Sequence, residues 1–519
     1  MIGRTETVEN LFDRFGPNYR WFVAAVGLSG AAAMLMSATL VNVAVPHVMG
    51  GFGIGQDQVQ WMATAFLATM TASQLLNAWM LSALGQRLTF TLMLVIFAIG
   101  SLVSATAPSM EVLIVGRVMQ GFAAGIVQPM VMVTLFQVFP PDKRGLAMGI
   151  FGTGVVLAPG LGPTVAGMAI DAFSWRAMFL LPIPFLGLAM IGGLFIMPNP
   201  PRAERLPRFD WTGYGVLCLA LFCIMTGLAH GPRYGWSSDH VSSLLAAGLV
   251  TGLFFVWWQI RLDGPLLAIQ LFKNPVFSAA VFVAFVFGAG NFGSTYIIPV
   301  FVQEVQGYTA TRAGMVMAPS AIVLAMMLPF TGRMADLVPG YLMIIAGLIA
   351  FAIGTGLMMT ADVNTPFWTY AIFGVISRMG LGFILPSLSS TALKALTPDE
   401  LSKGSGNMNF IRQLGGASGT NLIVVWLLVQ TSFHGDALIA TQTAGNEASS
   451  SLLAGVRDLL AASGANSNVQ EGVAMAFLND IVIAQAESFA FQDCFLALAA
   501  VFAFAVLPAW LLGQAQKRG

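Results

Sequence analysis

Charged side chains are scarce in this sequence. Asp, Glu, Lys and Arg make up 9% of its 519 residues, while 57% of the residues are hydrophobic. Ordinary globular proteins are about one quarter charged, so too few polar groups are present here to cover a water-soluble surface. Apolar runs of roughly 20 residues, long enough to cross a bilayer, recur along almost the whole chain. The composition therefore predicts an all-α polytopic membrane protein.

Cysteine and histidine are also scarce, and neither is placed for disulfide or metal chemistry. The three cysteines, Cys218, Cys223 and Cys494, fall within apolar runs, where cysteine acts as a small buried side chain. The four histidines do not show the spacing of metal ligands. We therefore expect no disulfide framework, no metal site and no cofactor.

Motifs of enzyme chemistry are missing as well. The sequence has no Walker-type glycine loop followed by lysine and no HExxH motif. These absences argue against an enzyme and favour a protein that draws its energy from a gradient rather than from nucleotide hydrolysis. No nucleic-acid partner is expected.

The apolar runs are interpreted as fourteen membrane-spanning helices. Their expected ranges are 22–46, 59–83, 88–108, 111–138, 144–170, 176–197, 211–230, 239–261, 275–302, 311–335, 340–360, 366–395, 402–430 and 488–513. An even number of spans places both termini on one side of the membrane. If that side is the cytoplasm, most of the 23 Lys and Arg residues fall in inner loops and tails, as the positive-inside rule requires. We expect an integral protein of the bacterial inner (plasma) membrane with both termini cytoplasmic.

Two connections between the spans stand out. Residues 198–210, PNPPRAERLPRFD, form a proline-rich basic linker that marks a boundary after the sixth span. Residues 431–487, rich in Ala, Ser and Asn with helical stretches near 452–462, are expected as an extracytoplasmic loop. Loops of that length are usually functional or disordered.

The fourth and fifth spans carry residues that are unusual in a membrane helix. In the fifth, small residues recur every four positions from Gly154 to Ala166, on one face that admits a close neighbour. Pro159 and Pro163 add kinks there. In the fourth, Arg117 at bilayer depth costs about 2.5 to 3.5 kcal/mol, so it should face the protein interior. Either it bonds backbone carbonyls structurally, or it takes part in the passage of ions or substrate.

These two spans resemble those of a known family. GRVMQGFAAG and APGLGPTVAG are similar to the fourth-span arginine motif and the fifth-span antiporter motif of the major facilitator superfamily. ATLVNVAVP, FPPDKRG, FDWTGYG and VQEVQGYTATRAG resemble stretches of the fourteen-span EmrB/QacA-type multidrug exporters. The resemblance implies a secondary transporter that exports drugs by proton antiport, a function linked to antibiotic resistance. The motif residues that it implicates in transport are Gln120, Gly121, Pro159, Gly162, Pro163 and Gly167.

The resemblance also implies the domain organisation. A six-helix N-terminal bundle would cover residues 1–197, a linker with two inserted helices residues 198–262, and a second six-helix bundle residues 263–519, with the extracytoplasmic loop at 431–487. Arg378 in the twelfth span weakly repeats Arg117 in the fourth. Repeats of this kind place a substrate site near the membrane midplane, between the two halves.

Two departures from the family pattern bear on proton coupling. Members commonly carry an acidic residue in the first span and another after the second span, where this chain has Ser37 and Ser82. Glu304, at the outer end of the ninth span, is then the preferred proton-linked residue, and Asp336 is expected to help gate the cytoplasmic side. Arg117 and Arg378 complete the predicted coupling and gating set. The missing acids favour an alternative, a carrier of lipids or amphipathic metabolites with weak or no proton coupling.

Polar and soft apolar side chains on the inward faces predict the substrate cavity. The residues expected to line it are Asn42, Trp61, Gln128, Met132, Phe292, Tyr296, Asn409 and Arg412. Aromatic and Met walls with few charges suit lipophilic or amphipathic small molecules of many shapes. Protons and membrane lipids are further expected partners, and residues 431–487 could dock a periplasmic membrane-fusion adaptor protein.

Overall fold

The structure is a computed structural model that describes residues 6–140, 144–199, 208–262, 264–397, 400–443, 445–463 and 466–518. Within these ranges the regular structure is helical, and extended backbone pairs at one isolated bridge, between Glu6 and Asn199. Twelve helices are long and apolar enough to cross a membrane. The predicted all-α polytopic fold is confirmed.

The first part of the chain forms one group of packed helices. These are α1 (Val8–Phe15), α2 (Tyr19–Phe52), α3 (Gln56–Val59), α4 (Trp61–Gln74), α5 (Asn77–Leu84), α6 (Gln86–Ala105), α7 (Met110–Val138), α8 (Arg144–Ala172) and α9 (Ile183–Ile196). Short 3₁₀ helices occur at Gly16–Asn18 and Trp175–Phe179. α7 packs against α2, α4 and α6, and α2 also packs against α8 and α9.

The second part begins with a pair of helices that pack on each other, α10 (Trp211–Tyr234) and α11 (Asp239–Arg261). After a 3₁₀ turn at Ile269–Lys273 come α12 (Pro275–Glu304), α13 (Ala310–Leu337), α14 (Gly340–Met358), α15 (Phe367–Lys394), α16 (Leu401–Ala440), α17 (Glu447–Ala462), α18 (Ser467–Phe504) and α19 (Val506–Arg518). α12 packs along α16, and α15 packs against α13 and α14. The division at residues 197 and 262 stays a prediction.

The number of spans differs from the expected fourteen among the described residues. The range 59–83 forms two helices, because the regular helix is interrupted at Leu75 and Leu76 between α4 and α5. α8 is a continuous helix of 29 residues, Arg144–Ala172, and the apolar stretch of its described side chains is Val156–Ala172. The other twelve expected ranges coincide with helices long and apolar enough to cross a membrane, so a count of fourteen stays a prediction.

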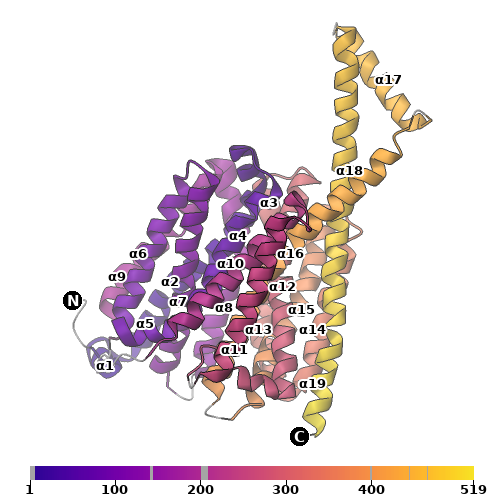
Figure 1. The fold of residues 1–519 in the computed structure, drawn as a ribbon. Coiled ribbons are helices and arrows are strands. Elements are labelled where there is room, and N and C mark those ends of the chain that lie inside the picture. The colour runs from indigo at the N-terminus through magenta and orange to yellow at the C-terminus, as the bar shows by residue number, and fades with distance from the viewer. Residues whose placement is uncertain are drawn as a thin grey trace.

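The most extensive contacts between helices of the two parts are α8 with α13, α4 with α16, and α2 with α12. We call the end of the bundle at α3 the α3 end, and the opposite end, where α1 and the C-terminal residues lie, the α1 end (Figure 1). At the α3 end one hydrophobic core is shared by both parts, with Val43 and Val59 joined to Tyr296, Phe301 and Phe491. The two parts are therefore packed together at that end.

The expected loop at 431–487 contains the predicted helical stretch, and most of its other described residues are helical too. α16 continues to Ala440, α17 contains the predicted stretch 452–462, and α18 starts at Ser467 and runs into the body without a break. Figure 1 shows α17 and the first turns of α18 standing clear of the bundle. Ala-rich sequence sustains a helix away from the bundle because Ala has the highest helix propensity. The composition that suggested a loop therefore forms a helical projection.

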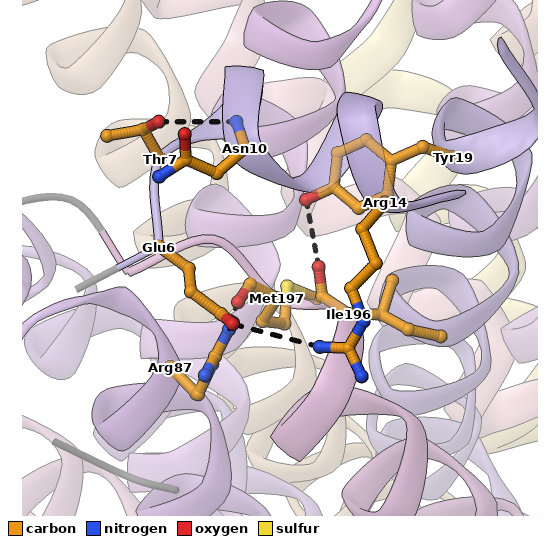
Figure 2. A network of polar contacts seen from close by, with 8 residues as sticks. All are labelled: Glu6, Thr7, Asn10, Arg14, Tyr19, Arg87, Ile196 and Met197. Atoms are coloured by element: carbon orange, nitrogen blue, oxygen red, sulfur yellow. Dashed lines mark hydrogen bonds and ion pairs between the residues drawn. The ribbon is translucent and has the colours of Figure 1, made fainter. Parts of the chain in front are cut away.

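At the α1 end, Arg87 is buried in the protein and forms an ion pair with a carboxylate of the N-terminal segment. The Arg87 side chain is 2% exposed, and its Nη2 lies 2.6 Å from Glu6 Oε2, while its Nε donates to the Met197 carbonyl. Arg14 lies 3.7 Å from the other Glu6 oxygen. Figure 2 shows Glu6 between the two arginines. The Ser82 hydroxyl donates to carbonyls of its own helix, those of Ala78 and Trp79.

Removal of the Glu6 carboxylate is expected to destabilise the fold. Glu6→Ala leaves a buried guanidinium without its counterion, which typically costs about 3 kcal/mol. The measurement is thermal unfolding of the purified protein in detergent. Glu9→Ala is the matched control, because Glu9 is exposed on the same segment and its loss should cost less than about 1 kcal/mol. Equal losses in the two variants would contradict the assigned role of Glu6.

Candidate functional site

A central cavity lies between the two parts of the chain. Its volume is about 130 Å³, and its walls come from α2, α7 and α8 on one side and α12, α13, α15 and α16 on the other. Of the predicted cavity residues, Gln128, Phe292 and Arg412 line it. The polar lining is otherwise supplied by Thr39, Asn291, Thr295, Ser320, Arg378 and Gln413.

Arg378 is held at the cavity wall by neutral oxygens. Its Nη1 donates to Asn291 Oδ1 and its Nη2 to Thr295 Oγ1, both at 2.6 Å, and the residue is 6% exposed. Asn291 and Thr295 are four residues apart on α12, so both face the same side of that helix. The guanidinium is therefore fixed in direction while its charge is not neutralised by these partners.

Arg412 is held more loosely at the same cavity. Its Nη2 donates to Asn409 Oδ1 at 2.9 Å, one turn earlier on α16. The α12 backbone comes very close to α16 here, since a Cβ on Gly288 would collide with the Arg412 carbonyl oxygen. Asn409, predicted to line the cavity, instead positions Arg412. Gln413, the next residue of α16, lines the cavity beside it.

Arg117 lies away from the cavity walls in a polar network of the N-terminal part. It is fully buried and donates to the Met62 carbonyl at 2.8 Å, to Ser37 Oγ at 3.1 Å and to Gln120 Oε1 at 2.7 Å. Its guanidinium also stacks over the Phe66 ring. The structure favours the first of the two sequence interpretations, in which Arg117 bonds structurally to carbonyls and neighbouring side chains. Ser37 contacts the guanidinium directly.

The glycines and prolines of α8 allow close contact with two neighbours. Pro163 has no N–H to bond the Pro159 carbonyl in the α-helical pattern, and Thr39 of α2 supplies that bond from its hydroxyl at 2.7 Å. Gly162 lies against Thr39, and a Cβ there would come within 2.7 Å of the hydroxyl. Only a glycine permits this approach, so this part of the motif builds the α2 contact.

The C-terminal half of α8 crosses α13 backbone to backbone. A Cβ on Gly167 would collide with the Ala310 carbonyl, and a Cβ on Gly314 would collide with the Pro163 carbonyl. Thr164 Oγ1 donates to the Gly314 carbonyl at 2.8 Å. Such close contacts between small residues are the main way in which membrane helices associate. The predicted motif residues Pro163 and Gly167 therefore lie in the contact between the two parts.

Further hydrogen bonds close the α3 end. Asn42 Nδ2 donates to the Thr295 carbonyl at 3.1 Å, which Pro299 cannot bond from one turn later. Gln303 Nε2 donates to the Val43 carbonyl at 3.0 Å. Asn42 was predicted as a cavity residue and instead belongs to this closure.

Two more hydrogen bonds at the closure involve residues whose role differs from the sequence-based prediction or was not predicted. Tyr296, predicted to line the cavity, donates from its hydroxyl to Gln56 Oε1 at 3.2 Å. The Thr311 N–H donates to Asp171 Oδ2 at 2.8 Å. Asp171 was not predicted. The sequence does contain a clue to its role, because Asp171 is an acid at the C-terminus of a helix, where the helix dipole disfavours negative charge. Such an acid needs a compensating partner, and here the first turn of α13 supplies it.

The remaining predicted residues lie outside the cavity walls. Trp61 and Met132 are half-buried and pack against hydrophobic cores. Glu304 is the last residue of α12, next to Gln303, and Glu487 of α18 is close enough to act on it electrostatically. Asp336 is in the last turn of α13, and its side chain lies outside the part of the chain that the structure describes. Gln120 is buried and donates to Ser101 on α6.

The comparison with known sequences finds transporters. The sequence model of the Major Facilitator Superfamily matches residues 27–420. Similar proteins include YcnB of Bacillus subtilis, described as an MFS-type transporter, with 30% identity over 81% of this chain and 89% of that protein. The lincomycin resistance protein LmrB of Listeria innocua is 27% identical over 75% and 83% of the two chains. The multidrug transporter protein MdtP of Bacillus subtilis is 28% identical over 75% and 73%.

Solved structures share the fold. An inward-facing, unoccupied bacterial homologue of the human lysosomal transporter Spinster aligns with a TM-score of 0.64 over 96% of this chain and 98% of that chain, at 14% identity. A POT family transporter aligns with a TM-score of 0.63 over 95% of both chains, at 12% identity. At these identities the likeness concerns the fold alone. Assignment to the fourteen-span EmrB/QacA-type group stays a prediction.

A methyl group on Gly167 is expected to weaken the contact between α8 and α13. Gly167→Ala overpacks a backbone contact, at a cost of about 1 to 3 kcal/mol, and so shifts the protein toward a form in which the two helices separate. A cysteine placed at buried Ala313 reports this shift by faster reaction with a maleimide. Gly152→Ala is the matched control, because Gly152 lies on α8 with nothing near its Cβ position. Unchanged labelling in Gly167→Ala would show that this contact does not hold the closure.

Proposed function

Because the chain belongs to the Major Facilitator Superfamily, we propose that it is a secondary active transporter that exports lipophilic or amphipathic compounds in exchange for protons. The observation that carries the proposal is the central cavity, whose walls come from both parts of the chain and are mainly apolar with a few fixed polar groups. Sites of that kind bind small molecules by shape and orient them through the polar groups. The names of the relatives, which include multidrug and lincomycin resistance transporters, support export as the direction of transport.

Alternating access follows from how the two parts of the chain meet. The cross-contacts that close the α3 end are side-chain hydrogen bonds and small-residue contacts, as with Asn42 and Gly167. Such contacts can break and reform without unfolding a helix. The proposed cycle opens the cavity to one side and then to the other by rocking of residues 1–197 against residues 263–519, with 198–262 between them.

Glu304 is the proposed proton-linked residue. It ends α12 beside Gln303, whose amide binds the Val43 carbonyl across the closure. Two neighbouring carboxylates such as Glu304 and Glu487 can share one proton. Release of that proton would change the charge next to the bond that holds the α3 end together. Arg378 and Asp336 complete the proposed gating set, with Arg117 in a supporting position.

A second candidate function is a carrier of lipids or amphipathic metabolites with weak or no proton coupling. The observation that favours it is the surroundings of Arg117, where the described partners are the Ser37 hydroxyl, a glutamine and a carbonyl rather than a carboxylate. A first-span acid at position 37 could titrate against Arg117, whereas a serine cannot. Under this candidate the proton gradient does not drive transport.

The proposed location is the bacterial inner membrane, with the α1 end and both termini in the cytoplasm. The projection formed by α17 and the first turns of α18 then lies in the periplasm. It exposes large apolar side chains, with Leu459 74% exposed, Met475 52% and Phe477 45%. Apolar surface of this kind marks interaction sites, and the proposed partner is a membrane-fusion adaptor protein.

Export of a lipophilic dye into inverted vesicles tests proton coupling. With an inward-acid gradient, vesicles that contain the protein should accumulate dye, and collapse of the gradient should abolish accumulation. Glu304→Gln removes the titrating group and should lower gradient-driven uptake by at least about 10-fold, as general acid–base groups typically contribute that much or more. Glu447→Gln, on the exposed projection, is the matched control. Uptake that survives loss of the gradient would support the weakly coupled carrier instead.

If the projection docks an adaptor protein, removal of the projection should abolish adaptor binding without affecting transport. Replacement of residues 441–478, which comprise α17 and the first turns of α18, by a Gly-Ser linker should abolish copurification of a membrane-fusion adaptor and leave dye uptake by inverted vesicles unchanged. The measurement is mass spectrometry of the purified complex beside the transport assay. If the full-length protein carries no adaptor, or the shortened one retains it, the projection has another role.

A further inference from the structure

The central cavity is lined by two arginines and by no acidic residue among those that the structure describes. Arg378 and Arg412 both border it, and the other described lining residues are neutral. Their hydrogen-bond partners, Asn291, Thr295 and Asn409, are neutral oxygens. Buried charges in membrane proteins are normally paired with a charge of opposite sign. The two positive charges of this cavity have no such partner at its walls.

Arg412 has unused donor capacity. A guanidinium carries five N–H donors, and the structure gives Arg412 one side-chain bond, to Asn409. The planar arrangement of the remaining donors matches carboxylate, sulfonate or phosphate oxygens, which guanidinium groups bind in a bidentate manner. Two nitrogens of Arg378 already donate to oxygens of α12, so Arg378 contributes mainly its positive charge to the binding of an anion.

Two buried amides face the same cavity from opposite parts of the chain. Gln128 on α7 is 9% exposed and Gln413 on α16 is 4% exposed. Both have a side-chain oxygen without a hydrogen-bond partner. Unsatisfied buried polar groups are rare and usually mark a place for a ligand or water. These oxygens are acceptors in the structure, but because neither is held by a hydrogen bond, each amide can rotate by about 180° to present its NH₂ group to an anion. Each part of the chain can then supply one donor to a bound group.

The rest of the lining is apolar and suits the body of an amphipath. Leu35, Phe287, Phe292, Leu324, Leu381 and Leu385 form these walls. A cavity of about 130 Å³ accommodates an acid group with about one ring, and a longer molecule fits once the two parts separate during transport. The charged donors and the apolar walls belong to the same space.

We infer that the compound exported under the proposed function is an amphipath with an acidic group, and that Arg412 binds this group with Arg378 supplying a second positive charge. The inference rests on the proposed function and narrows it from lipophilic compounds in general to organic anions. A neutral or cationic compound would leave the two guanidinium charges uncompensated. The chemistry fits a free organic acid or a lipid with a phosphate headgroup.

Two dyes that differ by one acidic group test the inference. 8-Anilinonaphthalene-1-sulfonate and N-phenyl-1-naphthylamine share the same rings, and only the first carries a sulfonate. Inverted vesicles that contain the protein should take up the sulfonate at least 10-fold faster than the neutral dye, after subtraction of vesicles without the protein. Ethidium serves as a cationic comparison. Competition by oleate and by lysophosphatidate shows whether a free acid or a lipid phosphate is preferred, and inhibition by either supports the inference.

Variants at the cavity separate binding from folding. Arg412→Gln should reduce the preference for the sulfonate at least 10-fold, and Arg412→Lys should restore part of it because the charge returns. A purely structural role would lower uptake of all dyes together and leave the ratio unchanged. Arg208→Gln is the matched control, since Arg208 is exposed outside the cavity. Monodisperse elution of each variant in detergent verifies that it is folded.

The outcomes distinguish the inference from the proposed function. Uptake of the neutral dye or ethidium that equals or exceeds uptake of the sulfonate overturns the inference and leaves export of lipophilic compounds standing. An unchanged ratio in Arg412→Gln overturns the role of Arg412. If the protein moves none of the three dyes, the proposed function fails and the inference fails with it.

Discussion

The backbone contact between α8 and α13 is the constraint on which the rest of the structure depends. Gly167 and Gly314 let the two helices touch at the α3 end, where any larger side chain would collide with a carbonyl. This contact joins the two parts of the chain, and the cavity lies beside the same two helices, where Gly160 faces Ala321. Membrane helices gain little from hydrophobic burial against each other, so close packing and hydrogen bonds must hold them together.

Prolines at this boundary supply acceptors rather than merely bending helices. Pro163 and Pro299 each leave a carbonyl one turn earlier without its helical donor, and side chains from α2, Thr39 and Asn42, bind those two carbonyls. Within the hydrocarbon region an unbonded carbonyl costs several kcal/mol. Each of these prolines therefore leaves a carbonyl that must accept a hydrogen bond from a side chain of a neighbouring helix. The Asn42 bond joins the two parts of the chain and could be exchanged for water if they separate, whereas the Thr39 bond lies within the first part.

The buried arginines show how far sequence reasoning reached. The cost of burial placed Arg117 in the protein interior, and that is where it lies, but its partners come from residues 37, 62 and 120 on three helices. Helical periodicity identified Gln128, Phe292 and Arg412 as inward-facing, and these line the cavity. Asn42 and Tyr296 also face inward, yet they bind across the closure. Periodicity gives the face of a helix, whereas the depth and tilt of its neighbour decide whether that face meets a cavity or another chain segment.

The sequence by itself determined the all-α membrane fold and the family, because the length and apolarity of the runs and the spacing of Gly, Pro and Arg are local properties. It indicated a helical stretch near 452–462 but could not determine that α17 and the first turns of α18 stand clear of the bundle as a projection, because the direction of that segment depends on its flanking helices. It also could not determine that Arg87 is paired with Glu6, 81 residues away. Only the tertiary structure decided these points, because pairing between distant residues depends on where packed helices place them.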